Sequence, residues 1–314
     1  QKSTEKLRGF FPSLNKLPPF DMNGNCCSSS ERRRLLLMTA NVGSLFEEDR
    51  RIQTSWLDVI VQRILREEAE VAVVHMQETG GKNYVECSAQ VPVLINMLAE
   101  QLRDTYPVCL AFLDLNYDGP AYTALGSLVF VRDSCVDLEQ FDFARREFSP
   151  VSPSPARIDI VTETLEAESR VRKEKFPKNF WPAFKWGRKG YLQTRWRLGR
   201  ERIMDFINVH LFHDESNLAL IHENPMLYSD NRKRAMNFTL ERCVLEGDND
   251  VFRYFFGDMN FRLDSRSFLN RITDKSELHP LDDVQQHGSA QGLESNSLGI
   301  DDLENGTADT LRRT

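Results

Sequence analysis

Four apolar runs of strand length each end in a polar residue, and this recurrence limits what the chain can fold into. The four residues are Asn41, Glu78, His210 and Asp258. Segments with the apolar spacing of amphipathic helices follow the first two runs and precede the last one. Strands that alternate with helices are typical of α/β proteins, whose sites lie at the carboxyl ends of the strands. The sequence therefore predicts an α/β fold with a polar site at one edge of a sheet.

The last of these runs is Val251-Phe-Arg-Tyr-Phe-Phe-Gly257, followed by Asp258-Met-Asn260-Phe-Arg262. Because a strand points alternate side chains to one side, an extended path beyond Gly257 would place Asp258, Asn260 and Arg262 on one face. A carboxylate, an amide and a guanidinium suit the hydrolysis of phosphate esters, which needs an acceptor to orient water and donors for the phosphoryl oxygens. The alternative is a buried strand that runs into an ordinary Gly-Asp turn.

The remaining elements follow from apolar periodicity and from the positions of glycine and proline. We expect helices over residues 56–65, 88–103 and 228–245. We expect strands over residues 34–42, 71–78, 108–113, 122–131, 136–143, 191–198, 202–210 and 251–262.

Composition divides the chain into three parts. The polar residues 1–33 predict a flexible arm, and residues 34–272 predict a single catalytic domain in which the proline-rich segment 148–168 forms a surface excursion. Residues 273–314 hold nine Asp or Glu residues against three Lys or Arg residues, which accounts for −6 of the net charge of −7. Since they contain no aromatic residue, we expect an acidic disordered segment there.

The segment Arg170–Arg202 is strongly basic, with twelve Lys or Arg residues against Glu174 and Glu201, and it is rich in aromatic residues. This excess of charge predicts a polyanionic partner, either a nucleic acid or a compact polyphosphate. The alternative is a solvated charged face over a core of aromatic residues. Within the segment, we place Arg188 and Lys189 nearest a ligand, because Gly190 allows the backbone to approach it.

The six cysteines show no CxxC spacing and several lie in apolar runs, which indicates reduced thiols rather than a disulfide framework or a zinc site. We expect no signal peptide, and no apolar run approaches the ~20 residues of a membrane-spanning helix. We therefore expect a soluble cytoplasmic protein.

The polar strand ends also carry a resemblance. Thr39-Ala-Asn41-Val, Gln77-Glu78, Asn208-Val-His210-Leu and Gly257-Asp258-Met-Asn260-Phe-Arg262 resemble, in this order, the motifs of the endonuclease/exonuclease/phosphatase superfamily, which has the fold of deoxyribonuclease I. Between residues 35 and 270, the many short matching runs are most similar to type I inositol polyphosphate 5-phosphatases. The resemblance implies a four-layer α/β sandwich, in which two mixed sheets pack face to face between helices.

The resemblance also implies a function and a role for each site residue. The family removes the 5-phosphate from inositol 1,4,5-trisphosphate and inositol 1,3,4,5-tetrakisphosphate with Mg2+, which ends calcium signalling. Glu78 would bind Mg2+ beside Asn41, Asp258 would orient or deprotonate the attacking water, and His210 and Asn260 would donate to the phosphoryl oxygens. The residues that would bind the remaining phosphates are Arg188, Lys189, Lys82, Arg232 and Arg262.

The sequence departs from the family pattern after Arg262. A Trp-Cys-Asp-Arg-Ile-Leu-like strand, a Ser-Asp-His-like pair and a C-terminal prenylation motif are all absent. We therefore expect the last strands of the fold to be missing and the 314-residue chain by itself to show little or no phosphatase activity. The full-length parent would be cytoplasmic and associated with the plasma membrane through a lipidated C-terminus. The role of His213, three residues after His210, stays open.

Two alternatives to a phosphatase remain. A nuclease of the same fold is disfavoured, because the positive charge is concentrated in one segment instead of spread along a groove as long as a duplex. Nucleic acid is therefore not an expected partner. The other alternative is an inactive truncated isoform that binds inositol phosphates without turnover.

Overall fold

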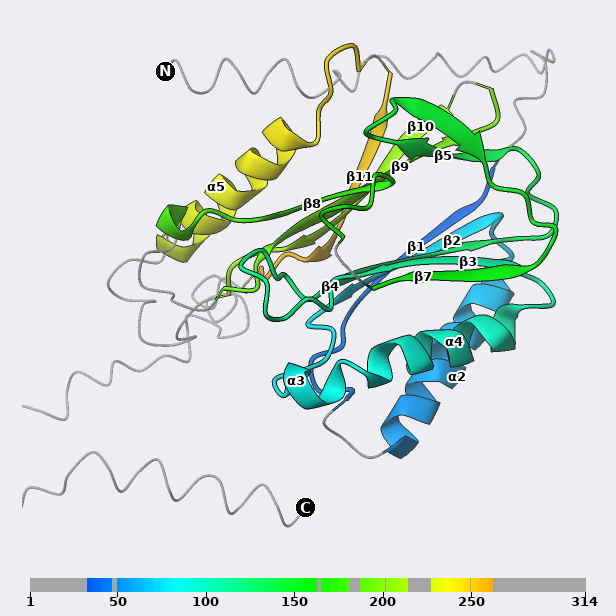
Figure 1. Ribbon diagram of the computed structural model, residues 1–314, viewed down its shortest axis with the longest axis horizontal. Coiled ribbons are helices and arrows are strands. Elements are labelled where there is room, and N and C mark those ends of the chain that lie inside the picture. Colours follow the sequence, from blue (N-terminus) through cyan, green and yellow to red (C-terminus); the bar gives the residue numbers. More distant parts are fainter. Residues whose placement is uncertain are drawn as a thin grey trace, which may run out of the picture. The chain divides into compact units, whose positions relative to one another are not determined.

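The structure is a computed structural model, and it describes residues 33–46, 50–162, 165–180, 187–200, 202–213, 227–248 and 250–261. All of them belong to the compact unit Gln1–Phe261. Two mixed β-sheets form its centre (Figure 1). Sheet A has the order β1-β2-β4-β3-β7, built from Leu35–Asn41, Val71–Gln77, Leu125–Val131, Val108–Leu113 and Arg157–Val161.

Sheet B has the order β11-β10-β9-β5-β6, and β8 also pairs with β9. Its strands in that order are Phe252–Asp258, Arg202–His210, Gly190–Leu198, Leu138–Asp142 and Glu147–Pro150, with β8 at Val171–Lys175. The helices are α2 (Arg50–Glu67), α3 (Tyr84–Cys87), α4 (Gln90–Leu102) and α5 (Leu227–Arg242), with a 3-10 turn at Lys178–Phe180.

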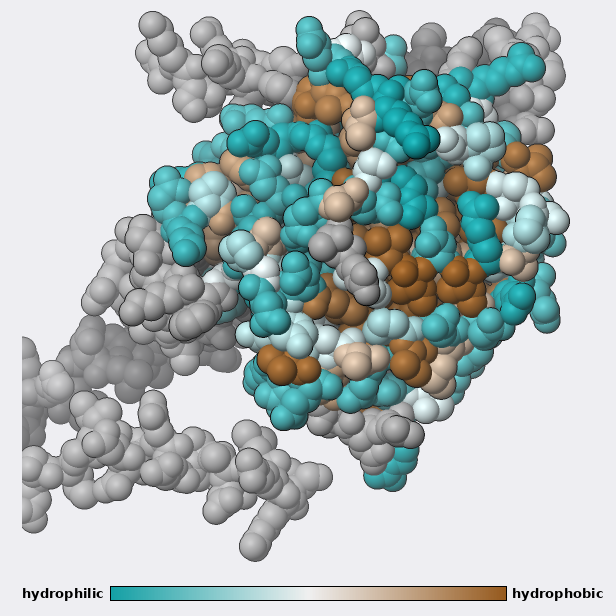
Figure 2. All heavy atoms as spheres, viewed as in Figure 1, coloured by the Kyte–Doolittle hydropathy of each residue, from teal (hydrophilic) through white to brown (hydrophobic). Residues whose placement is uncertain are grey.

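Three apolar cores separate four layers. Helices α2 and α4 cover the outer face of sheet A, where Leu57 and Ile64 of α2 pack with Ile95 of α4 (Figure 1). A second core fills the space between the sheets, and a third lies between sheet B and α5. Figure 2 shows a mostly hydrophilic surface on which hydrophobic residues gather where the two sheets meet. The expected four-layer α/β sandwich is confirmed.

Local sequence explains the elements that the apolar pattern predicted. In β2, β3 and β4 every residue is buried, as expected of strands that are covered on both faces. In α4 the buried positions Val91, Leu94, Ile95 and Leu98 follow the helical spacing. Strand β4 begins at Leu125 and not at 122, because Ala124 adopts a positive φ of 54° that interrupts the extended path.

Residues 148–168, expected to form a surface excursion, contain regular structure at the edges of the two sheets. This part of the chain completes β6 and supplies all of β7, which pairs in parallel with β3 at the edge of sheet A. The prolines fit this arrangement because Pro150 ends β6, whereas Pro153 and Pro155 lie in the connection before β7. Strand β8 was not predicted, since its alternation of charged residues gives no apolar signal.

Much of the positive charge in the segment 170–202 is neutralised within the fold. Arg195 is almost fully buried between Asp205 and Asp248, and its guanidinium nitrogens lie 2.6 Å from an oxygen of each. Lys173 lies 2.9 Å from Asp114, and Arg170 lies 2.7 Å from Asp159. The aromatic residues Phe176, Tyr191 and Trp196 are buried. The charge that remains for a polyanion is therefore smaller than the sequence suggested.

Cys87, Cys109, Cys135 and Cys243 are buried and form no disulfide bonds. Among the helices that the structure describes, none combines the length and the apolar character needed to cross a bilayer.

Candidate active site

The four polar strand ends meet at one place. Parallel pairing of β1 with β2 puts Asn41 opposite Gln77, next to Glu78, and parallel pairing of β10 with β11 puts His210 opposite Asp258. The two pairs belong to different sheets, and a hydrogen bond of 3.0 Å from Asn41 Nδ2 to Asp258 Oδ2 joins them. The carboxyl ends of four strands thus contribute to one polar cluster.

Continuous polar contacts connect the members of this cluster. His210 Nε2 lies 3.4 Å from Asp258 Oδ2 and 3.6 Å from Glu78 Oε1. Lys189, in the loop before β9, contacts His210 Nε2 and has its Nζ 3.9 Å from Glu78 Oε1. The side chain of His210 is 1% exposed, whereas those of Glu78 and Asp258 are 28% and 24% exposed. Solvent can therefore reach the two carboxylates, whereas the imidazole lies on the buried side of the cluster.

The surroundings set the protonation of the central pair. Burial raises the pKa of Asp258, but hydrogen bonds from His210 and Asn41 outweigh this effect and hold the pKa well below its usual range. Burial lowers the pKa of His210, and the positive charge of Lys189 adds to that effect. At neutral pH the site therefore holds an ionised aspartate beside a neutral imidazole.

Backbone conformation at two positions aims the polar groups. Glu78 and Asn260 adopt positive φ values of 58° and 50°, which are uncommon outside glycine and turn each residue away from the path of the preceding strand. Gly43 leaves room for the carboxylate of Glu78, since a Cβ at this position would lie 2.5 Å from Glu78 Oε2. Its backbone nitrogen also donates to Asn41 Oδ1 at 3.0 Å.

Among the described residues, the chain does not continue on the predicted extended path beyond Asp258. Strand β11 ends at Asp258, and the positive φ of Asn260 breaks the alternation of side chains. Asn260 still belongs to the cluster, through hydrogen bonds to neighbouring residues. Its backbone nitrogen donates to Asp258 Oδ1 at 3.0 Å, and its Nδ2 donates to the Leu211 carbonyl at 2.9 Å. Arg262 lies outside the described residues.

The donor set fits a hard divalent cation. Glu78 offers a partly exposed carboxylate, and Asn41 offers an amide oxygen that lies beside the same glycine, Gly43. Oxygen ligands of this kind suit Mg2+, which proteins hold with one or two carboxylates and leave partly hydrated. Lys189 is the cation that lies beside Glu78 in the structure.

The predicted phosphate-binding residues lie at different distances from the cluster. Arg188 donates from Nη1 to the Gly81 carbonyl at 2.8 Å and stacks on the ring of Tyr84, 5.3 Å from its centroid. Lys82 follows Gly81 in the loop between β2 and α3, and its side chain is exposed. Arg232, on α5, is 9% exposed and donates to the Phe212 carbonyl at 3.4 Å. Lys189 touches the cluster directly, through His210.

Sequence reasoning assigned no role to a set of buried polar residues under the site. Gln77 and Asn208 are fully buried and hydrogen-bonded to each other, and Thr39 is bonded to Gln77. His75 is also fully buried, and its ring stacks on that of Phe256. A sequence signal does exist, because a strand buried on both faces rarely carries polar side chains without a partner for them.

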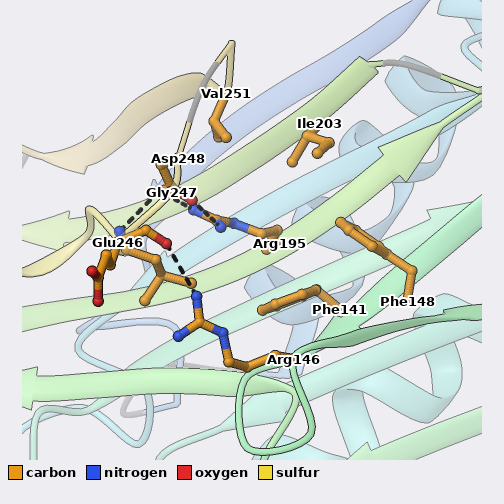
Figure 3. A pocket seen from close by; sticks show the side chains of 10 residues that line it. Phe141, Arg146, Phe148, Arg195, Ile203, Glu246, Gly247, Asp248 and Val251 are labelled. Atoms are coloured by element: carbon orange, nitrogen blue, oxygen red, sulfur yellow. Dashed lines mark hydrogen bonds and ion pairs between the residues drawn. The ribbon is translucent and has the colours of Figure 1, made fainter.

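Two other features of the described residues lie apart from the cluster. A pocket of about 190 Å3 at the opposite end of sheet B is lined by Arg195, Arg146 and Phe148 among others (Figure 3). Its Arg195 is held by Asp248, and its Arg146 donates to the Glu246 carbonyl at 3.1 Å. The charged side chains of Arg195 and Arg146 are therefore bound by other residues that line the pocket.

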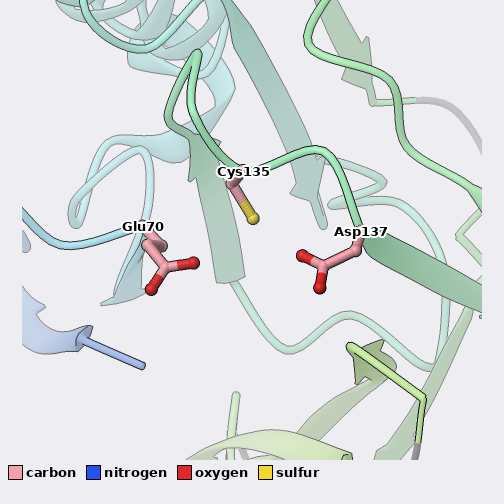
Figure 4. A group of neighbouring side chains, drawn as sticks. All are labelled: Glu70, Cys135 and Asp137. Carbon is pink, nitrogen blue, oxygen red and sulfur yellow. The ribbon is translucent and has the colours of Figure 1, made fainter. Parts of the chain in front are cut away.

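Glu70, Cys135 and Asp137 place possible ligand atoms within 4.8 Å of one another (Figure 4). Arg33 bridges the two carboxylates, and burial raises the pKa of the Cys135 thiol to about 12. A guanidinium between the carboxylates and a protonated thiol disfavour a metal ion, so this cluster is structural.

The chain is 48% identical over 282 residues to a probable type I inositol 1,4,5-trisphosphate 5-phosphatase of Caenorhabditis elegans, a match that covers 89% of this chain and 68% of that protein. It is 36% identical over 246 residues to inositol polyphosphate-5-phosphatase A of Homo sapiens, covering 78% of this chain and 58% of the human protein. No protein-family model matches the chain.

A solved structure of humanized D. rerio TDP2 aligns with a TM-score of 0.40 and 12% identity, covering 76% of this chain and 71% of that one. The nematode protein decides the family, because its identity of 48% extends over 89% of this chain. The chain belongs to the type I inositol polyphosphate 5-phosphatases.

Proposed function

We propose that this site is the centre of a Mg2+-dependent phosphomonoester hydrolase that removes the 5-phosphate from inositol 1,4,5-trisphosphate and inositol 1,3,4,5-tetrakisphosphate. The single observation that supports it best is the meeting of Asn41, Glu78, His210 and Asp258 in one cluster of ionised, amide and imidazole groups. Since the chain spans 68% and 58% of its two relatives, the activity is proposed for the whole protein that contains it.

The residues divide the reaction between them. The ionised Asp258 orients a water molecule and accepts its proton as the water oxygen attacks phosphorus. The bond between phosphorus and the ring oxygen breaks, and that oxygen takes up a proton, so the trisphosphate yields inositol 1,4-bisphosphate and inorganic phosphate. His210 donates to the phosphoryl oxygens, and Asn260 supplies the amide hydrogen that Leu211 does not use.

Glu78, with Asn41, would hold Mg2+, which when bound supplies positive charge for the phosphoryl oxygens and the leaving group. Lys189 and Arg188 would bind the other ring phosphates, since they lie beside the cluster on a loop whose position is fixed by Tyr84 and Gly81. For Lys82, Arg232 and Arg262 the same role stays a prediction. Their task is positioning, which provides a large part of catalysis in phosphoryl transfer.

The family also leads us to propose that the protein acts in the cytoplasm to end calcium signalling. For the whole protein we propose association with the plasma membrane through a lipidated C-terminus. Neither location enters the chemistry of the site.

The test is phosphate release by the whole protein from inositol 1,4,5-trisphosphate, with inositol 1,4-bisphosphate as the control substrate that lacks the 5-phosphate. We expect release from the trisphosphate only, dependence on Mg2+, and a loss of about 10²–10⁴-fold in Asp258→Asn. Equal release from both substrates, or full activity in Asp258→Asn, would contradict the proposal. Incision of DNA that contains abasic sites, without release from the trisphosphate, would favour the nuclease.

A further inference from the structure

A buried bridge of amide side chains joins the two sheets directly beneath the site. Gln77 is the last residue of β2 in sheet A, and Asn208 lies in β10 of sheet B. Gln77 Nε2 donates to Asn208 Oδ1 at 2.7 Å and to Thr39 Oγ1 at 3.1 Å. Both amide residues are 0% exposed, so no water competes for the bond between them.

The bridge also reaches the backbone of sheet A. Asn208 Nδ2 donates to the Met76 carbonyl at 3.0 Å and to the Gly126 carbonyl at 2.8 Å. Met76 and Gly126 are paired neighbours on β2 and β4. One side chain of sheet B therefore uses both of its amide hydrogens to hold two strands of sheet A.

Each member of the bridge lies next to a residue of the cluster. Thr39 is two residues before Asn41 on β1, and Gln77 immediately precedes Glu78. Asn208 is two residues before His210 on β10. A strand is stiff over two residues, so a fixed distance between the bridge atoms sets the distance between the groups above them.

A second contact has the same arrangement. His75 Nδ1 lies 3.1 Å from the carbonyl oxygen of Phe256, which is two residues before Asp258 on β11. The neutral imidazole, whose pKa burial lowers to about 3, can donate to that oxygen. All four strands of the cluster are thus held by polar contacts one or two residues below it.

We propose that Gln77, Asn208 and Thr39 are positioning residues that set the spacing of Asn41, Glu78 and His210 across the two sheets. The inference rests on the proposed Mg2+-dependent function. Apolar side chains of similar volume would fill the same space, but they tolerate small sliding of one sheet on the other, whereas hydrogen bonds fix one arrangement. The bridge therefore contributes more to the geometry of the site than to the stability of the fold.

The test compares three variants with a matched control. Gln77→Met, Asn208→Leu and Thr39→Val remove bridge atoms with little change of volume, and Thr39 lies on an exposed part of β1, so that variant folds even if the others do not. The control is Gln193→Met, which removes an equally buried amide that donates at 3.0 Å to Asp205 and to the Cys243 carbonyl, away from the cluster. Thr39→Ser keeps the hydroxyl and should behave as the unmodified protein.

Two measurements are made on each protein. Calorimetric titration with Mg2+ should show a dissociation constant about 10–100-fold higher in Gln77→Met and Asn208→Leu, a smaller increase in Thr39→Val, and no change in Gln193→Met. Hydrogen exchange without Mg2+ should be faster over residues 39–46 and 78–83 in the bridge variants, but not in the control.

The outcomes separate this inference from the proposed function. If the unmodified protein binds no Mg2+, the proposed function fails, and hydrogen exchange still decides whether the bridge positions the loops. If the unmodified protein binds Mg2+ and the bridge variants match it in both measurements, the positioning role is overturned and the proposed function stands. Equal effects in Gln193→Met would also overturn the inference, because they would indicate general destabilisation.

Discussion

Gly43 matters because it has no side chain, which leaves space for neighbouring oxygen atoms. A Cβ there would lie 2.5 Å from Glu78 Oε2 and 3.2 Å from Asn41 Oδ1, so the two oxygens of the proposed metal site share the space that this glycine leaves. The positions of these two oxygens therefore depend on the absence of a single methyl group at residue 43.

For Gly43→Ala we expect a Mg2+ dissociation constant about 10-fold higher, because the methyl group displaces the carboxylate of Glu78. The free energy of unfolding should change by less than about 1 kcal/mol, since the atom that must move ends a side chain. Gly187→Ala is the matched control, as its Cβ would meet only Lys189 Cγ at 3.9 Å. Calorimetric titration with Mg2+ measures the dissociation constant, and urea unfolding measures the free energy of unfolding. Equal affinities in the two variants would contradict this account.

His75 should make stability depend on pH. Its pKa is about 3 in the folded protein against 6.5 for an unperturbed histidine, because burial disfavours the charged imidazole. Between these values the unfolded chain binds a proton that the folded protein does not, so stability falls as pH is lowered from 6.5 toward 3. The slope from this residue is at most about 1.4 kcal/mol per pH unit.

His75→Asn removes this titration and keeps a nitrogen donor for the Phe256 carbonyl. The variant should be less stable at neutral pH, because it loses the ring stacked at 3.7 Å, but its stability should fall less steeply below pH 6.5. Urea unfolding at several pH values measures how the free energy of unfolding changes with pH in the unmodified protein and in His75→Asn. Identical slopes would show that His75 does not titrate in this way.

Among the elements, β9 and β10 connect the fold to the site. Lys189 precedes β9 and His210 ends β10, and in their antiparallel pairing His210 lies opposite Gly190. Farther along the same pair, Arg195 of β9 is held by Asp205 of β10 and by Asp248. The strands therefore carry the polar cluster at one end and a buried ion-pair network farther along.

Arg195→Leu should lower the free energy of unfolding by about 3 kcal/mol, because two buried carboxylates lose their main partner. This is the low end of the usual cost, since Arg253 remains beside Asp205 and Asp248. Arg200→Leu, in the exposed turn between the two strands, should stay within about 0.5 kcal/mol. Chemical unfolding compares them, and Mg2+ affinity should change in neither. Equal stability would mean that the network adds nothing to the fold.

On the scale of the whole molecule, the site joins two sheets that pack face to face, so metal binding should stabilise the complete fold. A ligand at 100 times its dissociation constant adds about 2.7 kcal/mol, which raises Tm by roughly 5–10 °C in a domain of this size. Thermal unfolding with and without Mg2+ measures the shift. We expect Glu78→Gln to lose most of it, and an undiminished shift in that variant would place the ion elsewhere.

Part of this architecture could be predicted from local sequence. The apolar runs predicted β1, β2, β3, β5, β9 and β10 to within a few residues, and helical spacing predicted α4 and α5. Strands β6 and β7 were not predicted because prolines lie in or beside them. Strand β8 was not predicted because its charged residues give no alternation of apolar and polar side chains. The positive charge of residues 170–202 misled the interpretation, since partners such as Asp205 and Asp248 lie outside the segment.

The sequence by itself determined which strand ends carry polar groups, because alternation and helical spacing are local properties of the chain. Only the tertiary structure decided which of these ends meet. The hydrogen bond between Asn41 and Asp258 spans 217 residues, and the bridge between Gln77 and Asn208 spans 131. Such pairings depend on how two sheets pack, which no short stretch of sequence encodes. The turn at Asn260, which breaks the predicted alternation, accompanies tertiary contacts to Asp258 and Leu211.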